Sequence, residues 1–100
     1  MLNEILAQNP NDAFARYGLA MEYSKAGDVE RSLSEFKKLL ESNPDYAAGY
    51  FMAAQTLARV GRNDEAKKLL TDGIAAARRT RNAHAQSEME AMLEDLGPTQ

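Results

Sequence analysis

The side chains that could do acid–base or metal chemistry are few in this sequence, and their spacing does not bring them together. His84 is the only histidine, and it has no cysteine or second histidine as a partner. A histidine on a helix surface without a nucleophile or second ligand seldom catalyses a reaction. The carboxylate pairs Glu88/Glu90 and Glu94/Asp95 are too close in sequence to share a helix face. We therefore expect a protein that is not an enzyme, with no catalytic residue, no cofactor and no metal site.

Three arginines lie close together at Arg78, Arg79 and Arg81, and such a cluster could bind a phosphate or an acidic peptide. The chain as a whole is acidic, with a net charge of -3 and a pI near 5.1, whereas nucleic-acid binders usually present a basic face. A place at the end of a helix, where cations oppose the negative pole of the helix dipole, already explains the cluster. Gly27 and Gly61 are isolated, so they form no phosphate-binding loop. We expect no nucleic-acid partner.

The composition of the sequence indicates in which cellular compartment the protein resides. The absence of cysteine excludes disulfides and fits a reducing compartment. The first ten residues lack the basic region and the long apolar run of a secretory signal, and no apolar run is long enough to cross a membrane. One hundred residues suit a single domain. These features predict a cytoplasmic protein without a membrane partner.

The positions of proline and glycine repeat at a fixed interval. Thirty-four residues separate Asn9-Pro10 from Asn43-Pro44, and the same interval separates Gly27 from Gly61. A period of this size is typical of proteins built from stacked helical repeats. The interval fails once, because Arg78 stands where a third proline is due. We expect the helix there to continue to about Thr80.

The positions of proline and glycine, together with the apolar periodicity, predict six helices, at residues 2–8, 12–26, 29–42, 46–60, about 63–80 and 83–96. The expected N-terminal caps are Asn11 or Asp12, Asp28, Asp45, Asn63 or Asp64, and Asn82. Helix 12–26 carries a second apolar face of Phe14, Tyr17 and Met21, and helix 46–60 carries one of Phe51 and Met52. A helix with two apolar faces must contact two neighbours.

At 34 residues per helix pair, the chain resembles the tetratricopeptide repeat family. The resemblance implies an all-α fold of antiparallel helix-turn-helix repeats, stacked as a short right-handed superhelix. The family's small and apolar positions are matched by Leu19, Ala20, Tyr23, Ser32, Phe36 and Leu40 in the first repeat, and by Tyr50, Ala53, Ala54, Leu57, Ala66, Leu70, Gly73 and Ile74 in the second. Arg16 departs from the usual aromatic residue, and Leu39 from the usual small one. Within one domain, 1–100, we expect a partial N-terminal helix at 1–12, repeats at 13–46 and 47–80, a capping helix at 81–96 and a frayed tail at 97–100.

The resemblance also implies where a partner would bind. The first helix of each repeat lines the concave face in this family, which gives as partner-binding residues Phe14, Tyr17, Met21, Lys25, Phe51, Met52, Gln55 and Arg59. The family's clamp for a peptide carboxyl terminus needs lysine and asparagines at three positions that are Tyr17, Met21 and Met52 here, so we do not expect that ligand. An apolar groove suits an amphipathic helix or an extended apolar segment of another protein.

Two alternatives remain open from the sequence. The same face, or the last helix with Met89, Met92 and Leu93, could form a homo-oligomer. The apolar side chains could instead be covered inside the protein by residues 2–8 or by the last helix. The acidic side of that last helix, with Glu88, Glu90, Glu94 and Asp95, favours a cap. The leading prediction is a non-catalytic module that binds a peptide or helix of another protein.

Overall fold

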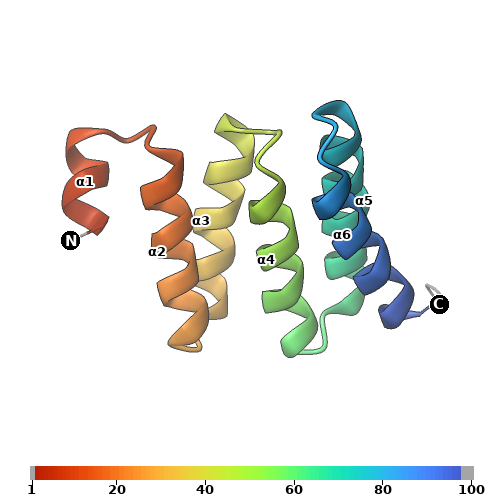
Figure 1. Ribbon diagram of the computed structural model, residues 1–100. Helices are drawn as coiled ribbons and strands as arrows, with labels where there is room; N and C mark the ends of the chain where they lie inside the picture. The colour runs from red at the N-terminus through yellow and green to blue at the C-terminus, as the bar shows by residue number, and fades with distance from the viewer. Residues whose placement is uncertain (1, 98–100) are drawn as a thin grey trace. The chain divides into compact units, whose positions relative to one another are not determined.

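The computed structural model describes residues 2–97, which form six α-helices (Figure 1). The helices are α1 (Leu2–Gln8), α2 (Ala13–Lys25), α3 (Val29–Ser42), α4 (Ala47–Arg59), α5 (Asn63–Arg79) and α6 (Ala83–Leu96). The chain divides into two compact units, Met1–Pro44 with α1 to α3 and Asp45–Gln100 with α4 to α6. Each predicted helix is present, with ends within one residue of those expected. The all-α class and the helix-turn-helix pairs are confirmed, while residues 98–100 of the predicted frayed tail, 97–100, lie outside the described residues.

The turns after α2 and α4 use a left-handed glycine, as the glycine positions predicted. Gly27 and Gly61 have φ values of 83° and 80°. Each is followed by a backbone bond that closes the preceding helix, from Asp28 N to Tyr23 O at 2.9 Å and from Arg62 N to Leu57 O at 3.0 Å. The turn after α5 has the same bond, from Asn82 N to Ala77 O at 2.8 Å, but its left-handed residue is Arg81, with φ 57°.

Three of the predicted N-terminal caps are confirmed. The carboxylates of Asp12 and Asp28 and the amide oxygen of Asn82 accept bonds from the backbone N–H groups of Ala15, Arg31 and Ala85, at 2.9, 3.2 and 3.1 Å respectively.

The other two predicted caps are wrong. Helix α4 begins after Tyr46 and α5 after Arg62, and neither residue makes a capping side-chain bond. Asp45 is not a cap because its carboxylate accepts two bonds from Arg79, at 2.7 and 3.0 Å. Asn63 and Asp64 are not caps because α5 starts at Asn63, which places both residues inside its first turn and leaves Arg62 at the cap position.

In the first unit, α2 packs between α1 and α3. Leu6, Ala15 and Leu19 form a buried cluster against which Leu2 and Tyr23 pack, so α1 is held by a small apolar contact with α2. On the α3 side, the buried hydroxyl of Ser32 donates to Ala20 O at 2.8 Å, which joins the two helices of the first repeat.

In the second unit, α4, α5 and α6 meet at Gly73. A Cβ atom at Gly73 would lie 2.5 Å from Met89 Sδ and 2.6 Å from Tyr50 Cβ. Glycine therefore permits the close approach of Tyr50 from α4 and of the fully buried Met89 from α6. Burial raises the pKa of the Tyr50 phenol.

The two residues that depart from the family pattern, Arg16 and Leu39, are explained by comparison with the corresponding residues of the second repeat. Tyr50 in the second repeat, which lies over Gly73, corresponds to Arg16 in the first, and Gly73 corresponds to Leu39. The fully buried Leu39 supplies the bulk in the first repeat. Arg16 makes an ion pair with Glu35 at 2.5 Å and donates to Pro10 O at 3.0 Å.

The 34-residue period fails at Arg78, where a third proline is due, and α5 is longer than α3 as a result. Helix α5 has 17 residues and its counterpart α3 has 14, as the absence of a third proline predicted. The additional turn carries Arg79, whose sequence separation from its ion-pair partner Asp45 is 34 residues. The carboxylate of Asp45 raises the pKa of the Arg79 guanidinium, which stays charged.

Candidate protein-interaction surfaces

Helix α2 presents the first part of the predicted surface. Phe14 is 77% exposed, which is unusual for a phenylalanine. Tyr17 is half-buried, and its ring lies edge-on to that of Phe36, with a centroid separation of 6.4 Å and an interplanar angle of 68°. Met21 is half-buried, and Lys25 is exposed in the last turn of the helix. The α2 face, defined as Phe14, Tyr17, Met21 and Lys25, thus has an aromatic start and a cationic end.

Helix α4 presents the second part. Phe51, Met52 and Gln55 are half-buried, and Arg59 is exposed in the last turn. The α4 face, defined by these four residues, also combines apolar side chains with a cation in the last turn of the helix. Each unit therefore carries an apolar patch next to a cation at the carboxyl end of a helix, where the helix dipole favours positive charge.

Helix α1 bears on the alternative that the apolar residues are covered within the protein. Leu2 approaches Gly18, with its Cδ1 atom 3.2 Å from where a Cβ atom on Gly18 would lie. Ser24, which like Gly18 belongs to α2, is buried. Position Gly18 of α2 is thus covered by α1, whereas Phe14 remains exposed.

The side chains with possible acid–base or anion chemistry are dispersed. His84 is exposed on α6 and lies 3.2 Å from the Glu88 carboxylate, one helical turn away. Arg78 pairs with Glu90 at 3.4 Å, and Arg79 pairs with Asp45. Within residues 2–97 no three histidine, aspartate or glutamate side chains gather where they could hold a metal ion. No helix in the described part of the chain is long and apolar enough to cross a membrane.

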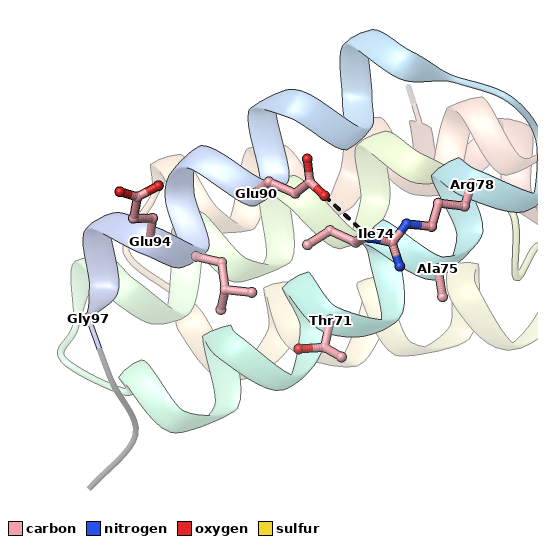
Figure 2. A pocket seen from close by; sticks show the side chains of 8 residues that line it. Thr71, Ile74, Ala75, Arg78, Glu90, Glu94 and Gly97 are labelled. Carbon is pink, nitrogen blue, oxygen red and sulfur yellow. Dashed lines mark hydrogen bonds and ion pairs between the residues drawn. The ribbon is translucent and has the colours of Figure 1, made fainter.

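A groove between α5 and α6 was not predicted from the sequence. It has a volume of about 730 Å³, and its apolar lining includes Ile74 and Ala75 of α5 and Leu93 of α6. Figure 2 shows these two helices side by side, with the Arg78–Glu90 ion pair crossing between them. The apolar stripe of the last helix contained Leu93, but the pattern alone did not distinguish a residue facing the groove from one facing the core.

A sequence model described as "Tetratricopeptide repeat" matches residues 23–88. A TPR repeat-containing protein of Pseudomonas aeruginosa is 30% identical over 95 residues, which covers 95% of this chain and 90% of that protein. The chain belongs to the tetratricopeptide repeat family. This membership confirms the resemblance on which the repeat boundaries were predicted, and the fold of this family is one that serves protein–protein interaction.

Solved structures of tetratricopeptide repeat proteins have the same fold. The solution structure of a tetratricopeptide repeat domain protein from Salinibacter ruber has a TM-score of 0.83 and 31% identity, covering 89% of this chain and 90% of that one. The crystal structure of PcrH in complex with the chaperone binding region of PopD has a TM-score of 0.86 and 20% identity, covering 95% of this chain and 72% of that one. At that identity, the second likeness concerns the fold alone.

Proposed function

We propose that this tetratricopeptide repeat protein is a non-catalytic module that binds a peptide or helix of another protein through the α2 face and the α4 face. The observation that carries the proposal is the exposure of Phe14 at the start of α2. Burying such a side chain contributes about 1.5–3 kcal/mol of favourable free energy. Folding of this chain leaves Phe14 exposed, so this free energy is gained only when a partner covers it. Aromatic residues with methionine beside them suit a surface that adapts to a partner.

The charges on the two faces indicate the chemistry of the partner. Lys25 and Arg59 each lie in the last turn of their helix. A matching segment would combine apolar anchors with an acidic flank, so that its carboxylates approach these cations. The complex of PcrH with a segment of PopD is consistent with the proposal, because it gives an example of this fold bound to part of another protein.

The expected affinity is modest. Three or four buried apolar side chains contribute about 1.5–3 kcal/mol each, and association entropy and ordering offset several kcal/mol of that gain. The remainder corresponds to dissociation constants of roughly micromolar order. A protein of this kind would act reversibly in a cytoplasmic setting, as the sequence predicted.

A peptide selected from a display library against the full chain tests this proposal. Phe14→Ala and Phe51→Ala should each weaken its binding about tenfold, as the loss of a buried aromatic contact predicts. Val60→Ala is the matched control, because Val60 is also an exposed apolar residue, 51% exposed, but lies in the turn after α4. Circular dichroism should show unchanged helicity in all three variants.

Two results would contradict the proposal. Equal binding by Phe14→Ala, Phe51→Ala and Val60→Ala would mean that the peptide binds elsewhere. Unfolding of Phe51→Ala would assign Phe51 to the core rather than to a surface. Sedimentation velocity over a range of concentrations tests the alternative of a homo-oligomer, since dimerisation abolished by Phe14→Ala would reassign the α2 face to self-association.

A further inference from the structure

The groove between α5 and α6 shares no residue with the α2 and α4 faces, and both of its walls belong to the second unit. Ile74, Ala75 and Leu93 give it an apolar lining. The Thr71 hydroxyl, also at the groove, donates to Lys67 O of its own helix at 2.9 Å, so it needs no partner from outside. An apolar groove between two helices is the kind of surface on which a third helix packs.

The rim of the groove is acidic. Glu90 and Glu94 of α6 line it, together with Arg78 of α5 (Figure 2). Arg78 is already paired with Glu90 at 3.4 Å, whereas no ion pair joins Glu94 to a basic residue within residues 2–97. The charge that the groove offers to a partner is therefore negative.

The helix dipole strengthens this preference. Glu94 and Asp95 lie in the last turn of α6, which contains no basic residue. Carboxylates are disfavoured at the carboxyl end of a helix because the dipole is negative there, and a cation is favoured. A basic side chain from a partner would relieve this repulsion when it approached Glu94.

Two ways in which a second copy of this chain could occupy the groove are disfavoured by the same acidic charge. Pairing of two α6 helices would place Glu90 and Glu94 against the same carboxylates. Helix α1 of a second copy has exposed Ile5, but its charged residue is Glu4 and it contains neither lysine nor arginine. Like charges would meet in both arrangements.

We propose that the α5–α6 groove binds an amphipathic helix of another protein, with an apolar stripe on Ile74, Ala75 and Leu93 and a lysine or arginine on Glu94. This partner differs in charge from the one proposed for the α2 and α4 faces, which would carry an acidic flank. The chain would thus bind two classes of partner through two separate surfaces.

Titration of the full chain, labelled with ¹⁵N, with a synthetic helical peptide tests the proposal. The peptide carries leucine and alanine on one face and lysine on its flanks, and a second peptide has glutamate in place of lysine. The lysine peptide should shift the amide resonances of α5 around Thr71–Arg78 and of α6 around Glu90–Leu96, and added salt should weaken its binding. The glutamate peptide should bind more weakly.

Matched variants locate the contact. Glu94→Lys should weaken binding of the lysine peptide about tenfold, the loss expected for one charge-assisted contact. Asp95→Lys makes the same charge change on the neighbouring residue, which does not line the groove, and should weaken binding by less than about twofold. Ala75→Arg should block the groove without unfolding the chain, because Ala75 is exposed.

Four results would overturn the proposal: equal affinity for the lysine and glutamate peptides, equal effects of Glu94→Lys and Asp95→Lys, resonance shifts confined to α2 and α4, or no binding of either peptide. Concentration-dependent dimerisation of the free chain that Ala75→Arg abolishes would also overturn it, by assigning the groove to a second copy.

Discussion

Gly73→Ala is a direct test of how the second unit is packed. The added Cβ atom would lie 2.5 Å from Met89 Sδ, 2.6 Å from Tyr50 Cβ and 3.0 Å from Tyr50 Cγ. The thioether of Met89 can adjust, but the Cβ atom of Tyr50 moves only with the backbone of α4. The substitution therefore forces α4 and α5 apart, or displaces the buried Met89 from its site.

The change in the free energy of unfolding that Gly73→Ala causes is the sum of two opposed effects. Replacing glycine by alanine inside a helix stabilises it by about 1 kcal/mol. Overpacking a well-filled core costs about 1–3 kcal/mol. The free energy of unfolding should therefore fall by about 0–2 kcal/mol, despite the better helix propensity of alanine.

Gly18→Ala is the matched control. Gly18 also lies inside a helix, but its nearest neighbour is the end of the Leu2 side chain, at 3.2 Å from the added Cβ atom. Leu2 belongs to the seven-residue α1 and can adjust. Gly18→Ala should therefore raise the free energy of unfolding by up to about 1 kcal/mol. The difference between the two variants, about 1–3 kcal/mol, isolates the overpacking at Gly73.

Hydrogen exchange of backbone amides measures both variants, because it reports local stability in α2 and α5 separately. Urea unfolding gives the total change. Met89→Ala in the Gly73→Ala background should relieve part of the clash, with a coupling of at least about 0.5 kcal/mol. Stabilisation of α5 by Gly73→Ala to the same extent as α2 by Gly18→Ala would refute the packing argument.

Three further changes test the helix ends and ion pairs. Arg81→Gly should raise the free energy of unfolding by about 0.5–1 kcal/mol in urea titrations, because Arg81 occupies a left-handed conformation with φ 57°. Arg62→Ala should raise the pKa of Glu65 toward its ordinary value in an NMR pH titration, because the Arg62 hydrogen bond lowers that pKa in the folded chain. Stability from this pair is present above the ordinary glutamate pKa and is lost as pH falls through the lowered value, so Arg62→Ala should flatten the acid limb of a thermal-melt pH profile. Asp45→Asn should lower the melting temperature slightly at low salt and not at high salt, because the Asp45–Arg79 pair is half exposed.

The helix boundaries could be predicted because glycine and proline end a helix through the conformations of their own backbone. Gly27 and Gly61 adopt the left-handed conformation that glycine permits, and Pro44 marks the end of a repeat whatever the side chains around it. The prediction of a cap at Asp45 was wrong, because its carboxylate accepts hydrogen bonds from Arg79, which lies 34 residues away in sequence. Local preference and a distant ion pair compete for one side chain, and the sequence around Asp45 contains no sign of the outcome.

The residues of the proposed interaction surfaces could be predicted only in part, for a related reason. Helical periodicity identified Phe14 and Tyr17 as lying on a second apolar face, but it could not say that Phe14 is exposed while Tyr17 packs against Phe36. Likewise, Leu93 belonged to an apolar stripe that was assigned to a cap. Whether such a residue faces the core or a groove depends on how α6 packs against α5, which is set by Gly73 and Met89.

Charge at the helix ends separates the two proposed surfaces. Lys25 and Arg59 complement the dipoles of α2 and α4, so a partner with carboxylates meets cations that are already favourably placed. Glu94 and Asp95 oppose the dipole of α6, so a basic partner removes a repulsion that exists in the free chain. Binding at the α5–α6 groove should therefore stabilise α6 itself, and amide exchange in its last turn should slow more than exchange in α2 when the lysine peptide binds. Equal slowing in both helices would indicate a general stabilisation rather than the relief of charge repulsion at Glu94.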